Sequence, residues 1–180
     1  MLRILNRLPD RKSVLSVFAW AAFLCYGWTL FASFWKVPSW SYYLTIGELL
    51  SMYAYSFIVN FLESLGLLLL ALGIGLFLPR RWWYETFSVK GSILVIVLLG
   101  SIMTRLYLVR TPDDWEIFLY HQTSWWLGTA ALLIGLLVLF SRFSWLQRGL
   151  EGLSDRVLTF LYLYLPLTAL SIFVVVFRNI

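Results

Sequence analysis

Charged residues are scarce in this chain, and their scarcity indicates its class. Of 180 residues, 13% are charged and 61% are hydrophobic. A soluble globular domain carries about 25% charged residues, so this chain lacks the polar surface to cover a water-exposed globule. The sequence therefore predicts an integral membrane protein, and the length suits one helical bundle without a sizeable soluble domain.

Cysteine and histidine, which bind zinc and haem iron in many proteins, are nearly absent as well. The chain has one cysteine, Cys25, and one histidine, His121. An intrachain disulfide, a His/Cys metal site and a bis-histidine haem all need more such residues, so they are excluded in a monomer. The chain also lacks a Gly-rich phosphate loop, a CxxC pair and a serine in a nucleophile elbow. We therefore expect no metal and no cofactor, and no catalytic motif identifies an enzyme.

What the chain has in quantity is apolar runs and aromatic residues. A transmembrane helix needs about 20 apolar residues. The run from Val14 to Trp35 has 22 residues without a charge, longer than the roughly 7–15 residues of a signal-peptide core. The ten tryptophans and ten tyrosines suit aromatic belts at the membrane surfaces. We predict an all-α integral membrane protein, a single bundle over 1–180, with transmembrane helices at about 14–35, 56–78, 92–108, 124–140 and 157–177.

The second apolar run is preceded by a segment that makes it too long for a simple crossing. No proline interrupts residues 45–78, and one helix of that length would be ~51 Å long against a hydrocarbon core of ~30 Å. Thr45 and Glu48 match a capping box, which gives Glu48 a structural role at a helix start. We therefore predict a short amphipathic, interfacial helix that leads into a span beginning near Ser56.

An acidic cluster precedes the fourth predicted span. Asp113, Asp114 and Glu116 directly follow Thr111 and Pro112. Threonine suits an N-cap, proline the first helical position, and acidic residues the first turn, where they complement the helix dipole. The cluster is therefore interpreted as a helix start rather than as a metal or substrate site.

Two further features are predicted towards the C-terminus. Residues 141–156 contain three arginines and are interpreted as a basic loop between the fourth and fifth spans. Pro166 lies near the middle of the fifth span, where it predicts a kink.

The basic residues are unevenly distributed between the two sides of the predicted bundle. If the five spans cross the membrane in alternating directions, ten basic residues lie on one side and three on the other. Cytoplasmic loops of membrane proteins are enriched in Lys and Arg. This predicts a cytoplasmic N-terminus and an extracytoplasmic C-terminus in a bacterial-type plasma membrane. Because the bases flank apolar runs, nucleic-acid binding is not expected. The ten are Arg3, Arg7, Arg11, Lys12, Arg80, Arg81, Lys90, Arg142, Arg148 and Arg156, and the three are Lys36, Arg110 and Arg178.

Two opposite charges lie inside predicted spans and form the candidate site. A carboxylate in a hydrocarbon segment is costly and usually faces a protein partner or a wet cavity. Counting from the cytoplasmic ends places Glu63 roughly 24 Å and Arg105 roughly 21 Å into the bilayer. We predict a buried polar cluster of Asn60, Glu63, Arg105 and His121, with an ion pair between the two charges. The cluster either locks helices together, forms a working pocket that opens to the outside, or points into a partner subunit.

One short phrase resembles a known family. The residues from Leu62 to Gly73, with Glu63 and Gly66, are similar to the second helix of DoxX-like small membrane proteins. The phrase covers 12 residues, and the five predicted spans differ from the four helices usual in that family. No function is carried over from this resemblance.

Two classes of function are compatible with these features. The first is a non-enzymatic accessory, assembly or scaffold subunit, whose partners are the lipid bilayer and other membrane protein subunits. The second is a membrane-embedded enzyme or carrier that handles a lipid-linked or small polar substrate from the extracytoplasmic side. A polar cavity containing several of the candidate residues favours the second, and a filled, dry bundle favours the first.

Overall fold

The described part of the chain is built from helices, as predicted, and contains no strand. The computed structural model describes residues 9–108 and 120–179. Five helical segments of this part are long and apolar enough to cross a membrane, which confirms their predicted number. In chain order the helices are α2 (Arg11–Phe34), α3 (Val37–Trp40), α4 (Ile46–Phe77), α5 (Arg80–Trp83), α6 (Phe87–Leu108), α8 (Gln122–Arg142), α9 (Ser144–Thr159) and α10 (Leu161–Asn179).

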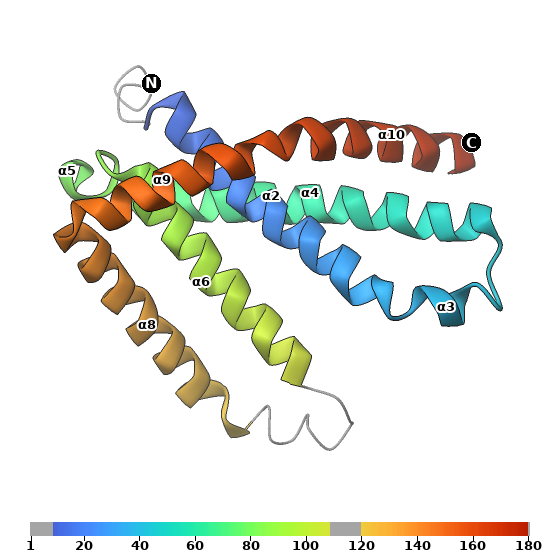
Figure 1. The fold of residues 1–180 in the computed structure, drawn as a ribbon, viewed down its shortest axis with the longest axis horizontal. Coiled ribbons are helices and arrows are strands. Elements are labelled where there is room, and N and C mark those ends of the chain that lie inside the picture. Colours follow the sequence, from blue (N-terminus) through green and yellow to red (C-terminus); the bar gives the residue numbers. More distant parts are fainter. Residues whose placement is uncertain (1–8, 109–119, 180) are drawn as a thin grey trace.

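Helix α2 is the centre of the fold, because α4, α6, α9 and α10 all contact it. Its small residues Ala19, Ala21 and Ala22 are buried, so neighbouring helices approach its backbone closely. Beyond α2 the bundle divides: α4 runs beside α10, and α6 runs beside α8 (Figure 1). The apolar core follows this arrangement, since most of its members lie on α2 and on the faces of α4, α6 and α10 that meet it.

Helix α4 is one uninterrupted helix of 32 residues, so the segment predicted as a short interfacial helix is continuous with the predicted span from Ser56. The predicted capping box is confirmed: the Thr45 hydroxyl accepts from the Glu48 backbone N–H at 3.3 Å, and the Thr45 N–H donates to the Glu48 carboxylate at 2.7 Å. The helix continues because α10 packs along it, and it ends where Pro79 imposes an extended conformation on Leu78.

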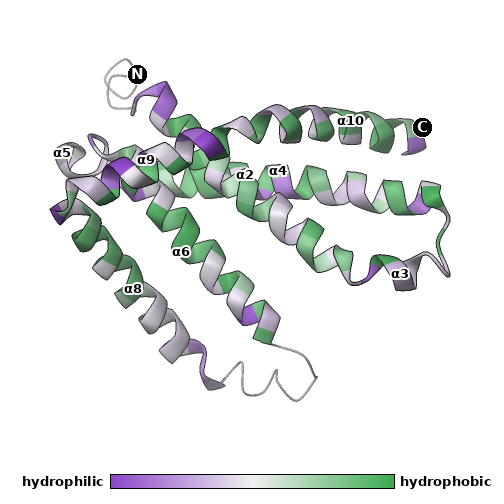
Figure 2. Cartoon of the chain, in the orientation of Figure 1, coloured by the Kyte–Doolittle hydropathy of each residue, from purple (hydrophilic) through white to green (hydrophobic). Residues whose placement is uncertain are grey.

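The predicted basic loop at 141–156 is wrong, because most of it belongs to helix α9. Leu150, Ser154 and Val157 recur at helical spacing and are buried on one side of α9, against the rest of the bundle. The polar face stays exposed, and Figure 2 shows hydrophilic residues along this helix. Burial of its apolar face stabilises α9 as a helix, although its charged residues had suggested a loop.

The fifth apolar segment is divided into two helices before it reaches Pro166. A single turn residue, Phe160, separates α9 from α10, while α10 continues as a helix through Pro166. The predicted helix start at Thr111 and Pro112, with its acidic residues 113–116, lies outside the described residues.

Candidate functional site

A large cavity lies between α2, α4 and α6. This main cavity has a volume of about 810 Å³. Leucines and other apolar side chains of α4 and α6 form most of its walls, with Trp28 on α2 and Tyr55 on α4. Ligand pockets in proteins are typically about 300–1,000 Å³, mostly apolar, with a few placed polar groups. The main cavity therefore has the size and character of a binding site.

Two of the four predicted site residues line the main cavity. Asn60 and Glu63 lie one turn apart on α4 and share a face of the helix. Asn60 is only 5% exposed, and its side-chain oxygen accepts from the Thr29 hydroxyl at 2.9 Å. Its side-chain nitrogen is buried and has no hydrogen-bond partner among the described residues. Glu63 is exposed to the cavity and is the one charged residue among its described lining residues.

The predicted ion pair between Glu63 and Arg105 is not formed. Among the described residues the one ion pair joins Lys12 to Asp155, at 3.0 Å on an exposed surface. Helix α2 packs between α4 and α6, which meet each other much less than they meet α2. The separation of α4 and α6 by α2 keeps the two charges apart.

Arg105 instead belongs to a polar cluster between α6 and α8. Its side chain is buried, and its guanidinium carbon lies 5.5 Å from the centre of the Trp125 ring. The Trp125 indole donates to the Ser101 hydroxyl at 2.7 Å, and Ser101 shares a hydrogen bond of 2.7 Å with Thr129. A cation held over an indole face in this way is attracted by the negative face of the ring.

His121, the fourth predicted residue, is exposed at the start of α8. Its backbone carbonyl accepts from the Trp125 N–H at 3.0 Å. It does not line the main cavity. The predicted cluster of four residues is therefore divided between two places in the fold.

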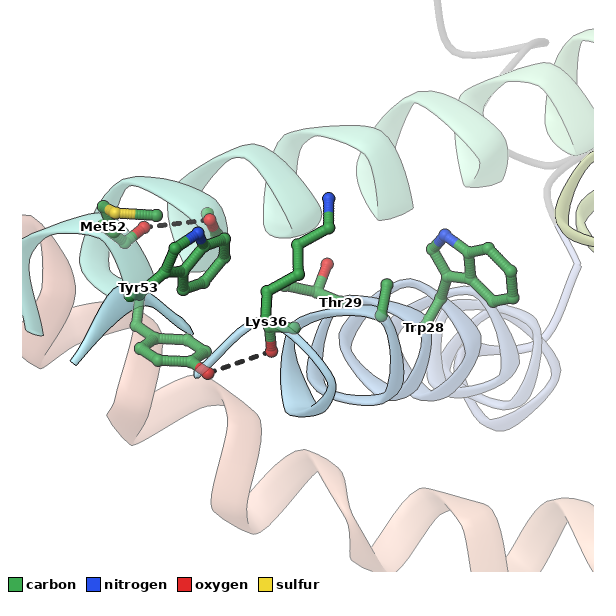
Figure 3. A pocket seen from close by; sticks show the side chains of 9 residues that line it. Trp28, Thr29, Lys36, Met52 and Tyr53 are labelled. Carbon is green, nitrogen blue, oxygen red and sulfur yellow. Dashed lines mark hydrogen bonds between the residues drawn. The ribbon is translucent and has the colours of Figure 1, made fainter. Parts of the chain in front are cut away.

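A smaller cavity adjoins the main cavity at the end of α2 and shares Trp28, Thr29 and Ser56 with it. This end cavity has a volume of about 250 Å³. Figure 3 shows Lys36 and Tyr53 in it, with the Tyr53 hydroxyl donating to Ser33 at 3.0 Å. Lys36 is the one cation among its described lining residues. The two cavities together thus carry a cation near the helix ends and a carboxylate deeper along α4.

Sequence reasoning missed the buried aromatic centre of the fold. Tyr26 is 1% exposed and stacks between Phe57 of α4 and Tyr164 of α10, with ring centres 5.4 and 4.6 Å away. Its hydroxyl donates to the Phe57 carbonyl at 3.0 Å and shares a hydrogen bond with the Thr168 hydroxyl. An interfacial belt was expected for tyrosines. The position of Tyr26 in the middle of the 14–35 run was the feature that could have indicated burial.

A third cavity, of about 530 Å³, forms a groove between α6 and α8. Small residues line much of it, among them Gly100, Thr104, Ser124 and Gly128. A Cβ atom added at Gly100 or at Gly128 would meet no described atom within 4 Å. Packing within the described chain therefore does not require glycine at either position.

Comparisons with known proteins give no assignment. No protein-family model, no curated protein and no solved structure matches this chain. The resemblance of residues 62–73 to one helix of DoxX-like proteins is thus not accompanied by a match to a family model.

Proposed function

We propose that this chain is a non-enzymatic accessory subunit of a membrane complex, and that a helix of another subunit packs against α8. The observation that carries the proposal is the near absence of burial on α8. Of its 21 residues, Thr129 is the one that is buried against the described chain. Large apolar side chains such as Leu127 and Ile134 are exposed at 66% and 62%. A partner helix or lipid must cover this surface.

The small residues of α8 favour a helix over lipid. Gly128, Ala131 and Gly135 recur at spacings of three and four, which places them on one face. All three are exposed, and neither glycine has a neighbour within 4 Å of an added Cβ among the described residues. Small residues on one face let a second helix backbone approach closely, which strengthens packing in a membrane.

Replacing Gly128 by leucine tests this proposal. The new side chain has room within the described chain, so the variant is expected to fold with an unchanged melting temperature. It should fill the groove and release the protein from its complex, measured as a shift from a stoichiometric complex to the isolated chain after extraction in mild detergent. Gly149→Leu is the matched control, since Gly149 on α9 is equally open. Wild-type protein that extracts alone, or a Gly128→Leu complex that stays intact, contradicts the proposal.

The proposed orientation places the N-terminus in the cytoplasm and the C-terminus outside. Its support is the gathering of basic residues at one end of the bundle. The start of α2, helix α5, the start of α6, the end of α8 and helix α9 meet there (Figure 1). Such a basic end is typical of the cytoplasmic side. Lys90, counted among these bases, also has a structural role, because its side chain donates to the Trp82 carbonyl and lies 4.2 Å from the Trp82 ring centre.

Cysteine labelling tests the orientation. In a Cys25→Ala background, a cysteine at Ser39 on α3 is expected to react with an impermeant thiol reagent on intact cells. A cysteine at Ser144, at the basic end, is expected to react only after permeabilisation. Both positions are exposed, so accessibility within the fold does not limit either reaction. The opposite labelling pattern would show that the bundle is inverted.

A carrier for a lipid-linked or small polar substrate is the second candidate function. The main cavity supports it, because Asn60 and Glu63 bring polar groups into an otherwise apolar space of about 810 Å³. Arg105 and His121 lie elsewhere, so the cavity contains two of the four residues expected for such a site. The distinguishing measurement is movement of a ligand across the bilayer of proteoliposomes that contain this chain alone.

A further inference from the structure

We propose that the main cavity binds a lipophilic ammonium ion that carries an oxygen next to its nitrogen, as in an N-alkyl amino alcohol. Glu63 pairs with the ammonium group, and the Asn60 side-chain nitrogen donates to the oxygen. Like the carrier role, this proposal requires the main cavity to be a ligand site. It concerns the binding of the ligand and not its transport.

The sign of the ligand charge follows from the lining of the cavity. Glu63 is the one charged side chain among its described lining residues, and no hydrogen bond or ion pair of the described residues satisfies its carboxylate. Arg105, the base expected to pair with it, is buried against Trp125 instead. A carboxylate in an apolar surrounding is costly without a partner of opposite charge. A cationic ligand supplies that partner.

The oxygen of the ligand follows from Asn60. This side chain is 5% exposed and lines the same cavity, yet its nitrogen has no acceptor among the described residues. Its oxygen already accepts from the Thr29 hydroxyl at 2.9 Å, which fixes the amide so that the nitrogen is the free donor. Asn60 and Glu63 are one helical turn apart on the same face of α4. This spacing lets one side chain bind the oxygen of an amino alcohol while the other binds its nitrogen.

The apolar part of the ligand follows from the remaining walls. Leucines 67, 70, 99 and 106 line the cavity on α4 and α6 and suit an alkyl chain. Trp28 offers an indole to the same space, and indole faces attract organic cations. Lys36 lies in the adjoining end cavity rather than among the lining residues of the main cavity, so it does not neutralise Glu63 at the site.

Equilibrium binding to the full chain in nanodiscs of zwitterionic lipid tests the inference. The probe is radiolabelled N-dodecylethanolamine, measured by scintillation proximity, with dodecylammonium and dodecanol as competitors. One saturable site per chain is expected. Dodecylammonium should compete more weakly than the amino alcohol, because it lacks the oxygen, and dodecanol, which has no charge, should compete least.

Three variants separate the roles of the residues. Glu63→Gln keeps the shape of the side chain and is expected to weaken binding of the probe about tenfold or more, since it removes a charged hydrogen bond. Asn60→Leu should remove the preference for the amino alcohol over dodecylammonium. Lys36→Gln is the control for charge and should leave binding unchanged or stronger. An unchanged elution volume and melting temperature verify that each variant is folded.

Several results would overturn the inference. They are the absence of saturable binding, equal affinity in Glu63→Gln, or weaker binding in Lys36→Gln, which would mean that the site takes an anion. Binding without movement of the probe across proteoliposomes would refute the carrier role and leave this inference standing.

Discussion

Replacing Tyr26 by alanine is expected to lower the free energy of unfolding by about 3–5 kcal/mol, the range for removing a large aromatic side chain from a core. Tyr26 is 1% exposed and lies where α2, α4 and α10 meet. Removing the ring takes away the stacking contacts that Tyr26 makes with Phe57 and Tyr164 and leaves a cavity beside them. The measurement is thermal unfolding of the purified protein in mild detergent.

Tyr26→Phe separates packing from hydrogen bonding at the same position. It keeps the ring and removes the hydroxyl that donates to the Phe57 carbonyl at 3.0 Å and bonds to Thr168. Hydrogen bonds between transmembrane helices contribute about 0.6 kcal/mol on average and at most about 1.7 kcal/mol. We therefore expect packing to dominate, with a much smaller loss for phenylalanine than for alanine. Equal losses for the two variants would show that the hydroxyl is the main contributor.

A matched control for Tyr26→Ala is available on α10. Tyr162 is 79% exposed. Tyr162→Ala removes the same atoms from a surface position, and it should change the melting temperature little. A loss as large as that of Tyr26→Ala would indicate that the exposed face of α10 is covered by another chain in the purified sample.

Replacing Gly91 by alanine is expected to destabilise the protein by about 1–3 kcal/mol, the usual cost of overpacking a core. The added Cβ would lie 2.7 Å from the Cγ2 atom of Val17 on α2. Val17 is fully buried, and its branched side chain has little rotational freedom at χ1, so it cannot turn away. Alanine is favoured over glycine inside a helix by about 1 kcal/mol, and the steric cost is expected to exceed this gain. Thermal unfolding in mild detergent measures the difference.

Gly100, on the same helix, gives the control of opposite sign. A Cβ there meets no described atom within 4 Å, so Gly100→Ala should leave stability unchanged or raise it by up to about 1 kcal/mol. Combining Gly91→Ala with Val17→Ala should restore part of the loss, because it removes the clashing methyl groups. If Gly91→Ala stabilises the protein, the close approach of α2 and α6 is wrong.

The features that the sequence predicted correctly depend on near neighbours in the chain. Long uncharged runs became helices, because a run of that length in apolar surroundings satisfies its backbone groups internally. The capping box at Thr45 and Glu48 formed, since both partners lie within one turn. The end of α4 before Pro79 follows from the restriction that proline places on the preceding residue.

What only the tertiary structure decided is which surfaces face one another. Counting residues gave Glu63 and Arg105 similar heights, but height along a bundle does not fix which side of a helix meets which neighbour. Because α2 lies between α4 and α6, Glu63 faces the main cavity and Arg105 meets Trp125 on α8. The same dependence on distant partners explains α9: its apolar face is buried against other helices, and the 141–156 segment alone, with its three arginines, resembled a loop.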